Sequence, residues 1–304
     1  MVVVLTGASG QVGCALRPLL ERRGDLLAPR RAEFDLSKPD TLAAALDGLR
    51  PDLIINAAAY TAVDRAEDEP ELAHRVNAEA PAAMARWAAR HGVPLVHFST
   101  DYVFDGSGSR PWREDDRCRP LSIYGQSKHQ GESGVRQAGG AHLIIRTAWV
   151  FASQGGNFLR TMVRLARQRS ELCVVDDQFG APTSARSIAQ AVMVILRAEK
   201  SAIASGFAEA GGIVHVTSAG ATSWHGFAVA IVEGLTNRGV PLAARRVIPI
   251  HTDDYPTKAR RPANSQLDLS RLSEVFGISM PIWQSALATE LDAFVREESS
   301  APPV

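Results

Sequence analysis

The chain has 304 residues, of which 45% are hydrophobic and 22% charged, and its basic and acidic side chains both number 33. This composition allows a packed core, and the balanced charge argues against bulk electrostatic binding to nucleic acid or to an anionic membrane. No stretch approaches the ~18 apolar residues that span a bilayer, and the apolar N-terminal run is too short for a secretory signal. Cys14, Cys118 and Cys173 show no metal-ligand or redox spacing. We therefore expect a cytoplasmic protein with reduced thiols that binds neither nucleic acid nor membrane.

Short apolar runs alternate with longer segments of helical period. The apolar runs predict strands at Val2–Thr6, Leu26–Ala28, Leu53–Asn56, Pro94–Ser99, Leu143–Thr147, Leu172–Val175 and Ile213–Val216. The longer segments predict helices at Gln11–Arg23, Thr41–Leu49, Asn77–His91, Ile123–Ala138, Asn157–Arg169, Ala185–Ala198 and Ser223–Arg238, with a last one within Pro281–Val295. Strands that alternate with helices pair in parallel through right-handed crossovers. The expected fold class is α/β, a Rossmann doubly wound parallel sheet with a smaller C-terminal substrate lobe.

The strand–helix rhythm loosens beyond Thr147, where Pro and Gly recur. We expect residues 1–148 and 172–198 to form the Rossmann domain that binds a dinucleotide, and residues 149–171 and 199–304 to form the substrate lobe. The small, Gly-containing segment Ala202–Gly212 predicts a surface loop, and the polar tail Glu297–Val304 is expected to fray. In open α/β sheets ligands bind at the carboxyl ends of the strands, so the lobe should close over that edge.

A glycine-rich loop directly follows the first predicted strand and opens a helix. Gly7 would allow a tight turn, Gly10 a close approach of backbone to a pyrophosphate, and Gly13 close packing of helix on strand. Backbone N–H groups at the helix N-terminus would then bind the phosphates. The alternative is an ordinary strand–helix turn, but the position of the loop at the start of the chain favours a dinucleotide site.

The end of the second predicted strand indicates which dinucleotide is bound. A ribose 2′-hydroxyl is normally recognised by an acidic residue about 20 residues past the loop, whereas an arginine accommodates a 2′-phosphate. Here the strand runs into Arg30 and Arg31, and the first acidic residues are Glu33 and Asp35. We therefore expect NADPH to be preferred over NADH, although both arginines could instead face solvent.

Tyr124 and Lys128 stand four residues apart at the start of a predicted helix and so share one face. A neighbouring ammonium would lower the tyrosine pKa and favour general acid/base catalysis. Thr100, at the end of the fourth predicted strand, should place a hydroxyl beside the tyrosine. Alone, this spacing is more often found for a surface tyrosine and a solvated lysine. Together with a dinucleotide site, Thr100, Tyr124 and Lys128 predict carbonyl reduction by hydride from the cofactor.

Two histidines, His97 and His215, lie within predicted strands. A catalytic or metal-binding role is conceivable for an imidazole. A strand interior favours packed, neutral side chains instead, so we expect both histidines to belong to the core.

The motifs together resemble the extended short-chain dehydrogenase/reductase family, and within it the dTDP-4-dehydrorhamnose reductases. The segments that carry this resemblance, in chain order, are GASGQVG, NAAAYTAVD, STDYVFDG, YGQSK, RTAWVF, NFLRTM, DDQFGAPT, the Trp224–His225 pair and YPTKARRPANS. The resemblance covers nearly the whole chain. It implies reduction of the C4 ketone of dTDP-4-dehydro-6-deoxy-L-mannose (dTDP-4-dehydro-beta-L-rhamnose) to dTDP-L-rhamnose with NADPH, in the biosynthesis of this polysaccharide precursor.

The same resemblance assigns further site residues. It places beside the cofactor Gln11, Val12, Asp35, Leu36, Ala57, Ala58 and Ala59, where the small alanine side chains leave room for a ribose. It places around the sugar Thr61, Val63, Asp101, Tyr102 and Trp149, and toward the nucleotide end of the substrate Asn157, Arg261 and Asn264. For Trp149 a purely structural aromatic contact is an equal alternative. For Arg261 a surface salt bridge is the alternative.

One departure from the family concerns a metal. Some members hold a metal between subunits with an acidic cluster. Here the first helix begins with Gln11 and Val12, and the stretch Thr183–Arg186 contains no carboxylate, although hard divalent cations need oxygen ligands. We therefore expect no metal, and the homodimer that the family suggests would not be metal-bridged.

Two other functions remain open from the sequence, and a third is disfavoured. A 4,6-dehydratase of this family needs a glutamate where Tyr102 stands. A related nucleotide-sugar epimerase is harder to exclude, and it would need no external reductant. An NADP-binding regulatory subunit without catalysis is the alternative from another class, because fold alone does not decide function.

Overall fold

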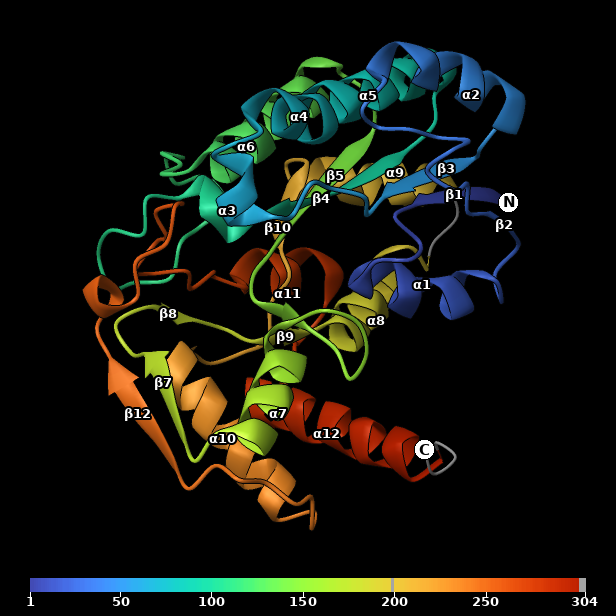
Figure 1. Ribbon diagram of the computed structural model, residues 1–304. Helices are drawn as coiled ribbons and strands as arrows, with labels where there is room; N and C mark the ends of the chain where they lie inside the picture. Colours follow the sequence, from blue (N-terminus) through green and yellow to red (C-terminus); the bar gives the residue numbers. More distant parts are fainter. Residues whose placement is uncertain (198–199, 301–304) are drawn as a thin grey trace.

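A parallel sheet of six strands forms the centre of the computed structural model, which describes residues 1–197 and 200–300 (Figure 1). The strand order is β2–β1–β3–β4–β5–β10, and each neighbouring pair is parallel. The strands span Val2–Thr6 (β1), Asp25–Leu27 (β2), Leu53–Asn56 (β3), Leu95–Thr100 (β4), His142–Thr147 (β5) and Ile213–His215 (β10). The order reverses beside β1, and such a switch point is where open α/β sheets bind dinucleotides.

Both faces of this sheet are buried, as the continuous apolar runs in the sequence require. Alternate side chains of one strand enter two different clusters: Leu53 and Ile55 face one cluster, and Ile54 between them faces the other. Figure 1 shows the two helix layers that complete these clusters, one on each face of the sheet. The helices on one face are α1 (Gln11–Leu20), α8 (Ala185–Ile195), α9 (Lys200–Glu209) and α11 (Ser270–Phe276). Those on the other face are α2 (Leu42–Leu49), α5 (Ala80–His91) and α6 (Ile123–Gln137).

A separate apolar cluster holds the smaller lobe together, below the sheet in Figure 1. Its helices are α7 (Phe158–Gln168), α10 (Trp224–Thr236) and α12 (Trp283–Ser300). They pack against a parallel pair formed by β7 (Glu171–Val175) and β12 (Arg246–Ile250). Two further pairs, β6 (Val150–Phe151) with β9 (Thr183–Ser184) and β8 (Phe179–Gly180) with β11 (Thr222–Ser223), lie near the junction with the sheet.

Short helical segments complete the description. They are α3 (Val63–Ala66), α4 (Pro70–His74), the π-helical turn η2 (Arg75–Glu79), and the 3₁₀ turns η1 (Pro39–Thr41), η3 (Asp101–Val103) and η4 (Thr252–Asp254). Of these, η3 matters most for the site, because it begins directly where β4 ends.

The predicted sheet is confirmed: all six of its strands were expected, with bounds that differ by at most one residue. The predicted loop at Ala202–Gly212 is wrong, because α9 covers most of it and buries Ile203 and Phe207 against the sheet. The frayed tail is wrong as far as Ser300, where α12 ends, and residues 301–304 lie outside the described residues. β7 was assigned to the Rossmann part, but it pairs with β12 of the lobe. The domain division itself stays a prediction.

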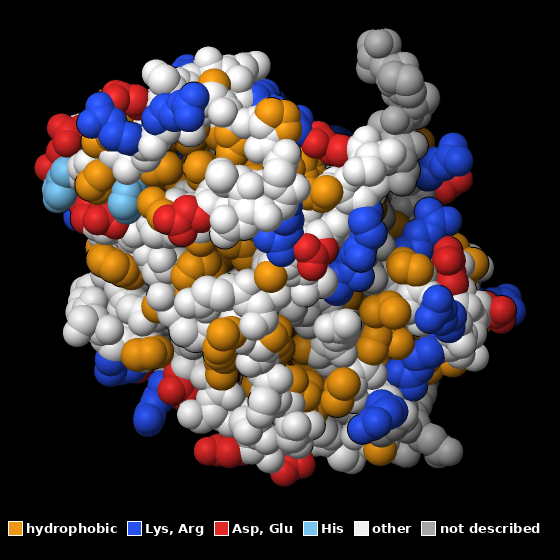
Figure 2. All heavy atoms as spheres, turned by 90° about the horizontal axis from the view of Figure 1, so that it is seen from below, with side chains coloured by type: hydrophobic (Ala, Val, Ile, Leu, Met, Phe, Trp, Pro, Cys, Tyr) orange, Lys and Arg blue, Asp and Glu red, His pale blue; other side chains and the backbone are white. Residues whose placement is uncertain are grey.

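Basic, acidic and apolar side chains are all spread over the face seen from below in Figure 2, which is consistent with the balanced composition. Among residues 1–197 and 200–300, no helix is both long and apolar enough to cross a membrane.

Candidate active site

The loop between β1 and α1 is packed too tightly for any residue but glycine at two of its positions. Gly7 has φ of +68°, and a Cβ there would lie 2.6 Å from the backbone nitrogen of Ala58. A Cβ on Gly13 would lie only 2.0 Å from the carbonyl oxygen of Gly7. The loop is therefore pressed against the residues that follow β3, so Ala57 and Ala58 lie beside it as expected.

The N-terminus of α1 fits a dinucleotide phosphate. Gly10 is the N-cap and supplies no side-chain cap, and the first turn contains no acidic residue. Free N–H groups and the positive end of the helix dipole favour an anion there. Gln11 in this turn donates to the carbonyl oxygen of Val150 over 3.4 Å, while its buried Oε1 has no partner. The residues present thus suit the expected pyrophosphate.

A buried polar chain connects the last residues of β1 and β3 to the middle of β4. The Thr6 hydroxyl donates to Oδ1 of Asn56 at 2.6 Å, and Nδ2 of Asn56 lies 3.0 Å from Nδ1 of His97. Burial lowers the pKa of His97 well below its usual value, and it lowers that of His215 to about 3. Both histidines are therefore neutral core residues, as the sequence predicted. The chain aligns the carboxyl ends of β1, β3 and β4 along one edge.

Thr100 and Tyr124 meet at this edge. Thr100 ends β4 and caps η3, where its hydroxyl accepts from the backbone N–H of Tyr102 at 3.2 Å and donates to Oδ1 of Asp101 at 3.0 Å. Tyr124 stands in the first turn of α6, close enough to Thr100 for the threonine hydroxyl to influence its ionisation. Gly125 makes this approach possible, because a Cβ there would lie 2.3 Å from the carbonyl oxygen of Tyr102. The structure therefore brings two of the three predicted catalytic residues close together.

The electrostatics of Tyr124 differ from the expectation. Burial raises the pKa of Tyr124 to about 12, against the opposite influence of the hydrogen bond with Thr100. The Nζ of Lys128 instead donates to the carbonyl oxygen of Phe98 at 2.5 Å, and Lys128 is only 2% exposed. The expectation that the lysine lowers the tyrosine pKa is wrong for this arrangement, because desolvation outweighs any attraction to the ammonium. Burial lowers the pKa of Lys128 itself to about 8.

Two neighbours complete the wall around Tyr124. Tyr102 lies edge-on to it, with ring centroids 5.6 Å apart and planes at 77°. Asp101 is 3% exposed, and burial raises its pKa to about 6 although hydrogen bonds with Ser265 and Thr100 act in the opposite direction. A carboxyl with this pKa changes its protonation within the range in which most enzymes work.

Arg261 comes from the C-terminal part of the chain to the same region. Its guanidinium forms a two-pronged pair with Asp64 of α3, at 2.7 Å and 3.2 Å. The pair lies close enough to affect the ionisation of Tyr102. The salt bridge that the sequence left open as an alternative is therefore present, and it joins the lobe to the edge of the sheet domain. Thr61 is exposed and Val63 is half-buried at the start of the same short helix.

Trp149 stacks on Trp224, with ring centroids 3.6 Å apart and planes inclined by 9°. Its φ of +49° is unusual for a residue that is not glycine. Gly180 packs directly on the indole, since a Cβ there would lie 2.6 Å from it. A half-buried, stacked pair of indoles provides a flat apolar wall, so Trp149 has a structural role that does not conflict with the predicted sugar contact.

Two predicted substrate residues have their side chains engaged in the fold. Asn157 caps α7: its Oδ1 accepts from the N–H of Arg160 at 3.1 Å, and its Nδ2 donates to the carbonyl oxygen of Ala152 at 2.9 Å. Asn264 is 4% exposed, and its Nδ2 donates to the carbonyl oxygen of Arg110 at 2.8 Å. Their assignment to the substrate site stays a prediction. The contacts show that each asparagine also stabilises the fold.

The residues predicted around the adenosine lie beyond β2. Arg30 and Arg31 are exposed, and Arg31 Nε is 3.7 Å from Oδ1 of Asp35. Hydrogen bonds from the backbone and hydroxyl of Ser37 lower the pKa of Asp35. Leu36 is buried in the core. The Asp35 side chain therefore bonds within its own turn, Arg31 lies in a loose pair with it, and both arginine side chains are exposed.

The sequence reasoning missed the buried ion pair of Glu132 with Arg146. Both side chains are 2% exposed, and Nη2 of Arg146 lies 2.7 Å from Oε2 of Glu132. The helical spacing from Tyr124 through Lys128 to Glu132 is the signal that could have revealed it.

Comparison with known proteins decides the family. The family model described as the RmlD substrate binding domain matches residues 1–296. The dTDP-4-dehydrorhamnose reductase of Burkholderia thailandensis is 49% identical over 289 residues, which cover 94% of this chain and 97% of that protein. The chain belongs to the dTDP-4-dehydrorhamnose reductase family.

Crystal structures of this family confirm the fold. The reductase of Clostridium acetobutylicum is 33% identical and superposes with a TM-score of 0.88. The superposition covers 97% of this chain and 100% of that one. The reductase of Bacillus anthracis, determined in complex with NADP, is 31% identical, with a TM-score of 0.85 and coverage of 97% and 99%. The predicted family, Rossmann fold and nicotinamide cofactor are therefore confirmed. The residue assignments within the site stay predictions.

Proposed function

We propose that this protein reduces the C4 ketone of dTDP-4-dehydro-beta-L-rhamnose to the alcohol of dTDP-L-rhamnose, with NADPH as the reductant. The observation that carries the proposal is that Thr100, at the end of β4, lies close to Tyr124, one helical turn from the buried Lys128, at the edge where the glycine loop ends. The family membership supplies the substrate class.

The cofactor would lie along the glycine loop and supply the hydride. Gly7 and Gly10 would let the backbone approach the pyrophosphate, and Arg30 and Arg31 would bind the 2′-phosphate, since guanidinium forks suit phosphate oxygens. Ala57–Ala59 would leave room for the adenosine ribose.

The chain's own groups would manage the proton. Thr100 would donate a hydrogen bond to the ketone oxygen and so orient it beside Tyr124. Tyr124 would give its phenolic proton to that oxygen as the negative charge develops there. Lys128 is a cation shielded from water near the same turn, so it would stabilise the phenolate left behind and bind the nicotinamide ribose.

The lobe would select the sugar nucleotide. We assign Tyr102, Asp101, Val63, Thr61 and Trp149 to the sugar pocket. Arg261, Asn157 and Asn264 are assigned to the nucleotide end. For Arg261 this requires that a substrate phosphate competes with Asp64 for the guanidinium, which is half-buried and charged throughout the working pH range.

One assay tests the proposal. Purified protein is mixed with NADPH and the dTDP-4-keto-6-deoxy sugar, loss of nicotinamide absorbance is followed, and the product is identified by mass spectrometry as the substrate plus two hydrogens. Tyr124→Phe should lower kcat by about 10²–10⁴-fold, because the general acid is lost while the ring remains. Binding of NADPH should persist.

Tyr60→Phe is the matched control, because it also removes a hydrogen-bonded phenol, which donates to Glu69 at 2.7 Å, but far along the chain from Thr100. It should keep most of the activity. A Tyr124→Phe enzyme that retains wild-type kcat would refute the assignment of Tyr124. An epimerase would convert the sugar without consuming NADPH, and a regulatory subunit would bind NADPH without any conversion.

We also propose that any homodimer forms without a bridging divalent ion. The first turn of α1 has no acidic residue, and Arg186 of α8 donates to Oε1 of Glu290 at 3.1 Å, which places a cation at the carboxylate. Sedimentation velocity with and without EDTA tests this. A dimer that dissociates on chelation and re-forms with Mg²⁺ would contradict it.

We place the protein in the cytoplasm, a compartment that keeps thiols reduced. Cys14, Cys118 and Cys173 are all free thiols in the structure. Cell fractionation with a tagged chain is the direct test.

A further inference from the structure

A third side chain lies on the same stripe of α6 as the two catalytic residues. Tyr124, Lys128 and Glu132 follow one another at intervals of four residues, and side chains at this spacing lie one above the next on a helix. Glu132 is a carboxylate that is 2% exposed. Burial of a charge at this depth is costly unless every lone pair finds a partner.

The partners of Glu132 come from two neighbouring strands. Its Oε1 accepts from the Ser99 hydroxyl at 2.6 Å and from Nε of Arg146 at 2.8 Å, and its Oε2 accepts from Nη2 of Arg146 at 2.7 Å. Ser99 of β4 and Arg146 of β5 are paired in the sheet, and the next residue along β4 is Thr100. One carboxylate thus fastens the helix that carries Tyr124 and Lys128 to the strand that carries Thr100.

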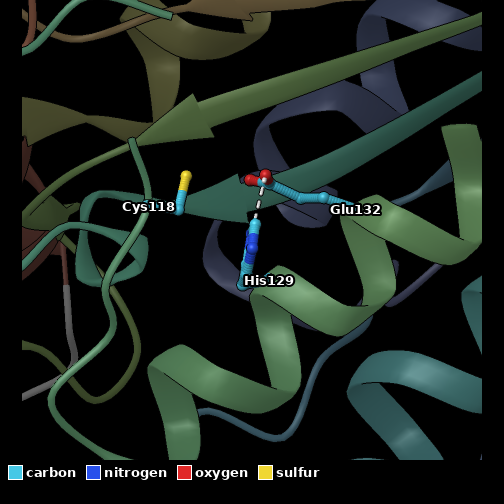
Figure 3. A group of neighbouring side chains, drawn as sticks. All are labelled: Cys118, His129 and Glu132. Carbon is cyan, nitrogen blue, oxygen red and sulfur yellow. Dashed lines mark ion pairs between the residues drawn. The ribbon is translucent and has the colours of Figure 1, made fainter. Parts of the chain in front are cut away.

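Charged groups surround this carboxylate on every side. Figure 3 shows His129 of the same helix reaching toward it, and Cys118 of the preceding loop beside them; His129 Nδ1 is 3.7 Å from Glu132 Oε2. Arg146 also donates to Sγ of Cys118 at 3.4 Å and to the backbone carbonyl of Glu114 at 3.2 Å. Burial raises the pKa of Glu132, but the Arg146 guanidinium more than offsets it and holds that pKa well below the usual range. Glu132 is therefore an anion at any working pH.

Cys118, His129 and Glu132 are also side chains of the kind that bind zinc. However, both oxygens of Glu132 are taken by Arg146, and the guanidinium would repel a metal cation at this place. The cluster is accordingly part of an ion-pair network that attaches α6 to the sheet.

Lys128 is the next charged group along the stripe. It is surrounded by the carbonyl oxygen of Phe98, by neutral His97 of β4, and by the carboxylate of Glu132. Burial lowers the pKa of Lys128 to about 8, and the Glu132 carboxylate acts in the opposite direction. Without that carboxylate, burial alone would determine how firmly the lysine holds its proton.

We propose that Glu132 is a positioning residue for the reduction: it fixes Thr100 against Tyr124 through Ser99, and its negative charge keeps Lys128 protonated. The inference rests on the proposed function in assuming that Tyr124 and Lys128 act on a ketone. The influence of Glu132 on the protonation of Lys128 does not depend on that assumption, and it can be measured in the protein without substrate.

The test reads the ionisation of Lys128 directly. Lysine occurs only at Lys38, Lys128, Lys200 and Lys258, so ¹³Cε-labelled lysine gives a simple NMR spectrum, in which Lys128→Arg assigns the signal. The wild-type signal of Lys128 should titrate near pH 8, well apart from ordinary lysines near about 10.4. In Glu132→Gln the midpoint should fall by about one pH unit or more, since a unit charge one helical turn away in a buried site is worth about this much.

A second variant keeps the test decisive if the first is unstable. Glu132→Gln leaves the Arg146 cation buried and unpaired, which is strongly destabilising, whereas Glu132→Gln combined with Arg146→Gln removes both charges. The double variant should fold. Its Lys128 midpoint should still lie below that of the wild type, but the downward shift should be smaller than in the single variant. Glu290→Gln is the matched control, because it removes another buried carboxylate that pairs with an arginine, Arg186 of α8, and should leave the titration of Lys128 unchanged.

Kinetics separate positioning from general loss of stability. The alkaline limb of kcat against pH should move down with the lysine midpoint, and kcat should fall by about tenfold or more with KM for the sugar nearly unchanged. An unchanged Lys128 midpoint in both Glu132 variants overturns the inference, as does a kcat loss that only mirrors the folded fraction. If the wild type fails to reduce the sugar, the proposed function is wrong, and the lysine titration still decides the role of Glu132.

Discussion

Two glycines three residues apart, Gly10 and Gly13, should respond to alanine in different ways. An added Cβ at Gly13 would lie 2.0 Å from the carbonyl oxygen of Gly7 and 2.7 Å from Cα of Ala8, and both are backbone atoms that cannot rotate away. An added Cβ at Gly10 would meet only the carbonyl oxygen of Gly7, at 3.3 Å. Gly13 is therefore required by the fold, and Gly10 by whatever approaches the helix N-terminus.

The magnitudes follow from these contacts. Relieving the overlap at Gly13 would move α1 by more than an ångström against a core that includes the fully buried Leu16. Overpacking typically costs about 1–3 kcal/mol and more where backbone must shift, so we expect a loss of at least about 3 kcal/mol. For a chain of this size that corresponds to a Tm lower by roughly 6–12 °C. Alanine at the N-cap Gly10 should cost below about 1 kcal/mol, partly offset by the stiffer unfolded chain.

Thermal unfolding and NADPH titration by fluorescence measure both effects. Gly10→Ala should keep its Tm within about 3 °C but bind NADPH at least tenfold more weakly, which is about 1.4 kcal/mol of lost phosphate contact. Gly206→Ala is the control: it lies in α9, where an added Cβ would meet only the ring of Phe276 at 3.4 Å, so it should change stability little and leave NADPH binding alone. A Gly10→Ala protein that binds NADPH like the wild type would place the pyrophosphate elsewhere. A Gly13→Ala protein with wild-type Tm would contradict the packing.

Three further outcomes are expected. Arg30→Ala and Arg31→Ala should each lower kcat/KM with NADPH relative to NADH, and an unchanged ratio in both variants would remove the arginines from the 2′-phosphate site. Incubation with dTDP-glucose should release no 4-keto-6-deoxy sugar, because Tyr102 stands where a dehydratase carries glutamate; mass spectrometry of the mixture decides. Burial lowers the pKa of His215 to about 3, below its unfolded value of about 6.5, so the folded state excludes a proton that the unfolded chain binds. Its contribution to stability is complete above pH ~6.5 and falls by about 1.4 kcal/mol per pH unit below it. Urea unfolding measures the free energy of unfolding at pH 7 and at pH 5. The decrease between these pH values should be about 2 kcal/mol smaller in His215→Asn than in the wild type, and equal decreases would mean that His215 is not buried in its neutral form.

Local signals made the sheet and the candidate site predictable. β1, the glycine loop and α1 follow one another in one short stretch of sequence. The glycines predicted there for steric reasons are required at Gly7 and Gly13, where a Cβ would overlap backbone atoms. Each strand of the sheet is short and mostly apolar, and it lies between helices of clear period. Because parallel strands end at a common edge, the motif residues Thr100 and Tyr124 could be expected together without any coordinates.

What the sequence did not reveal depends on contacts between distant segments. α9 contains small residues and a glycine that suggest a loop, but burial of Ile203 and Phe207 against the sheet overrides that weak propensity. β7 finds its partner β12 some 75 residues later, with no local signal for the pairing. The spacing of Asn157 in its motif did not show that its side chain caps α7.

The high pKa of Tyr124 fits a reductase better than the lowered value expected from the sequence. A reductase must keep its proton until hydride arrives, and burial of Tyr124, with a pKa of about 12, keeps the phenol intact across the working pH range. Alcohols are weaker acids than phenols, so proton transfer from Tyr124 to the new alkoxide remains favourable. Lys128 meanwhile donates to the Phe98 carbonyl, one helical turn away, and its cation is available to stabilise the phenolate only once that charge exists. The buried, protonated Tyr124 is therefore ready to act as the acid of a reduction, with Lys128 one helical turn away on the same stripe of α6.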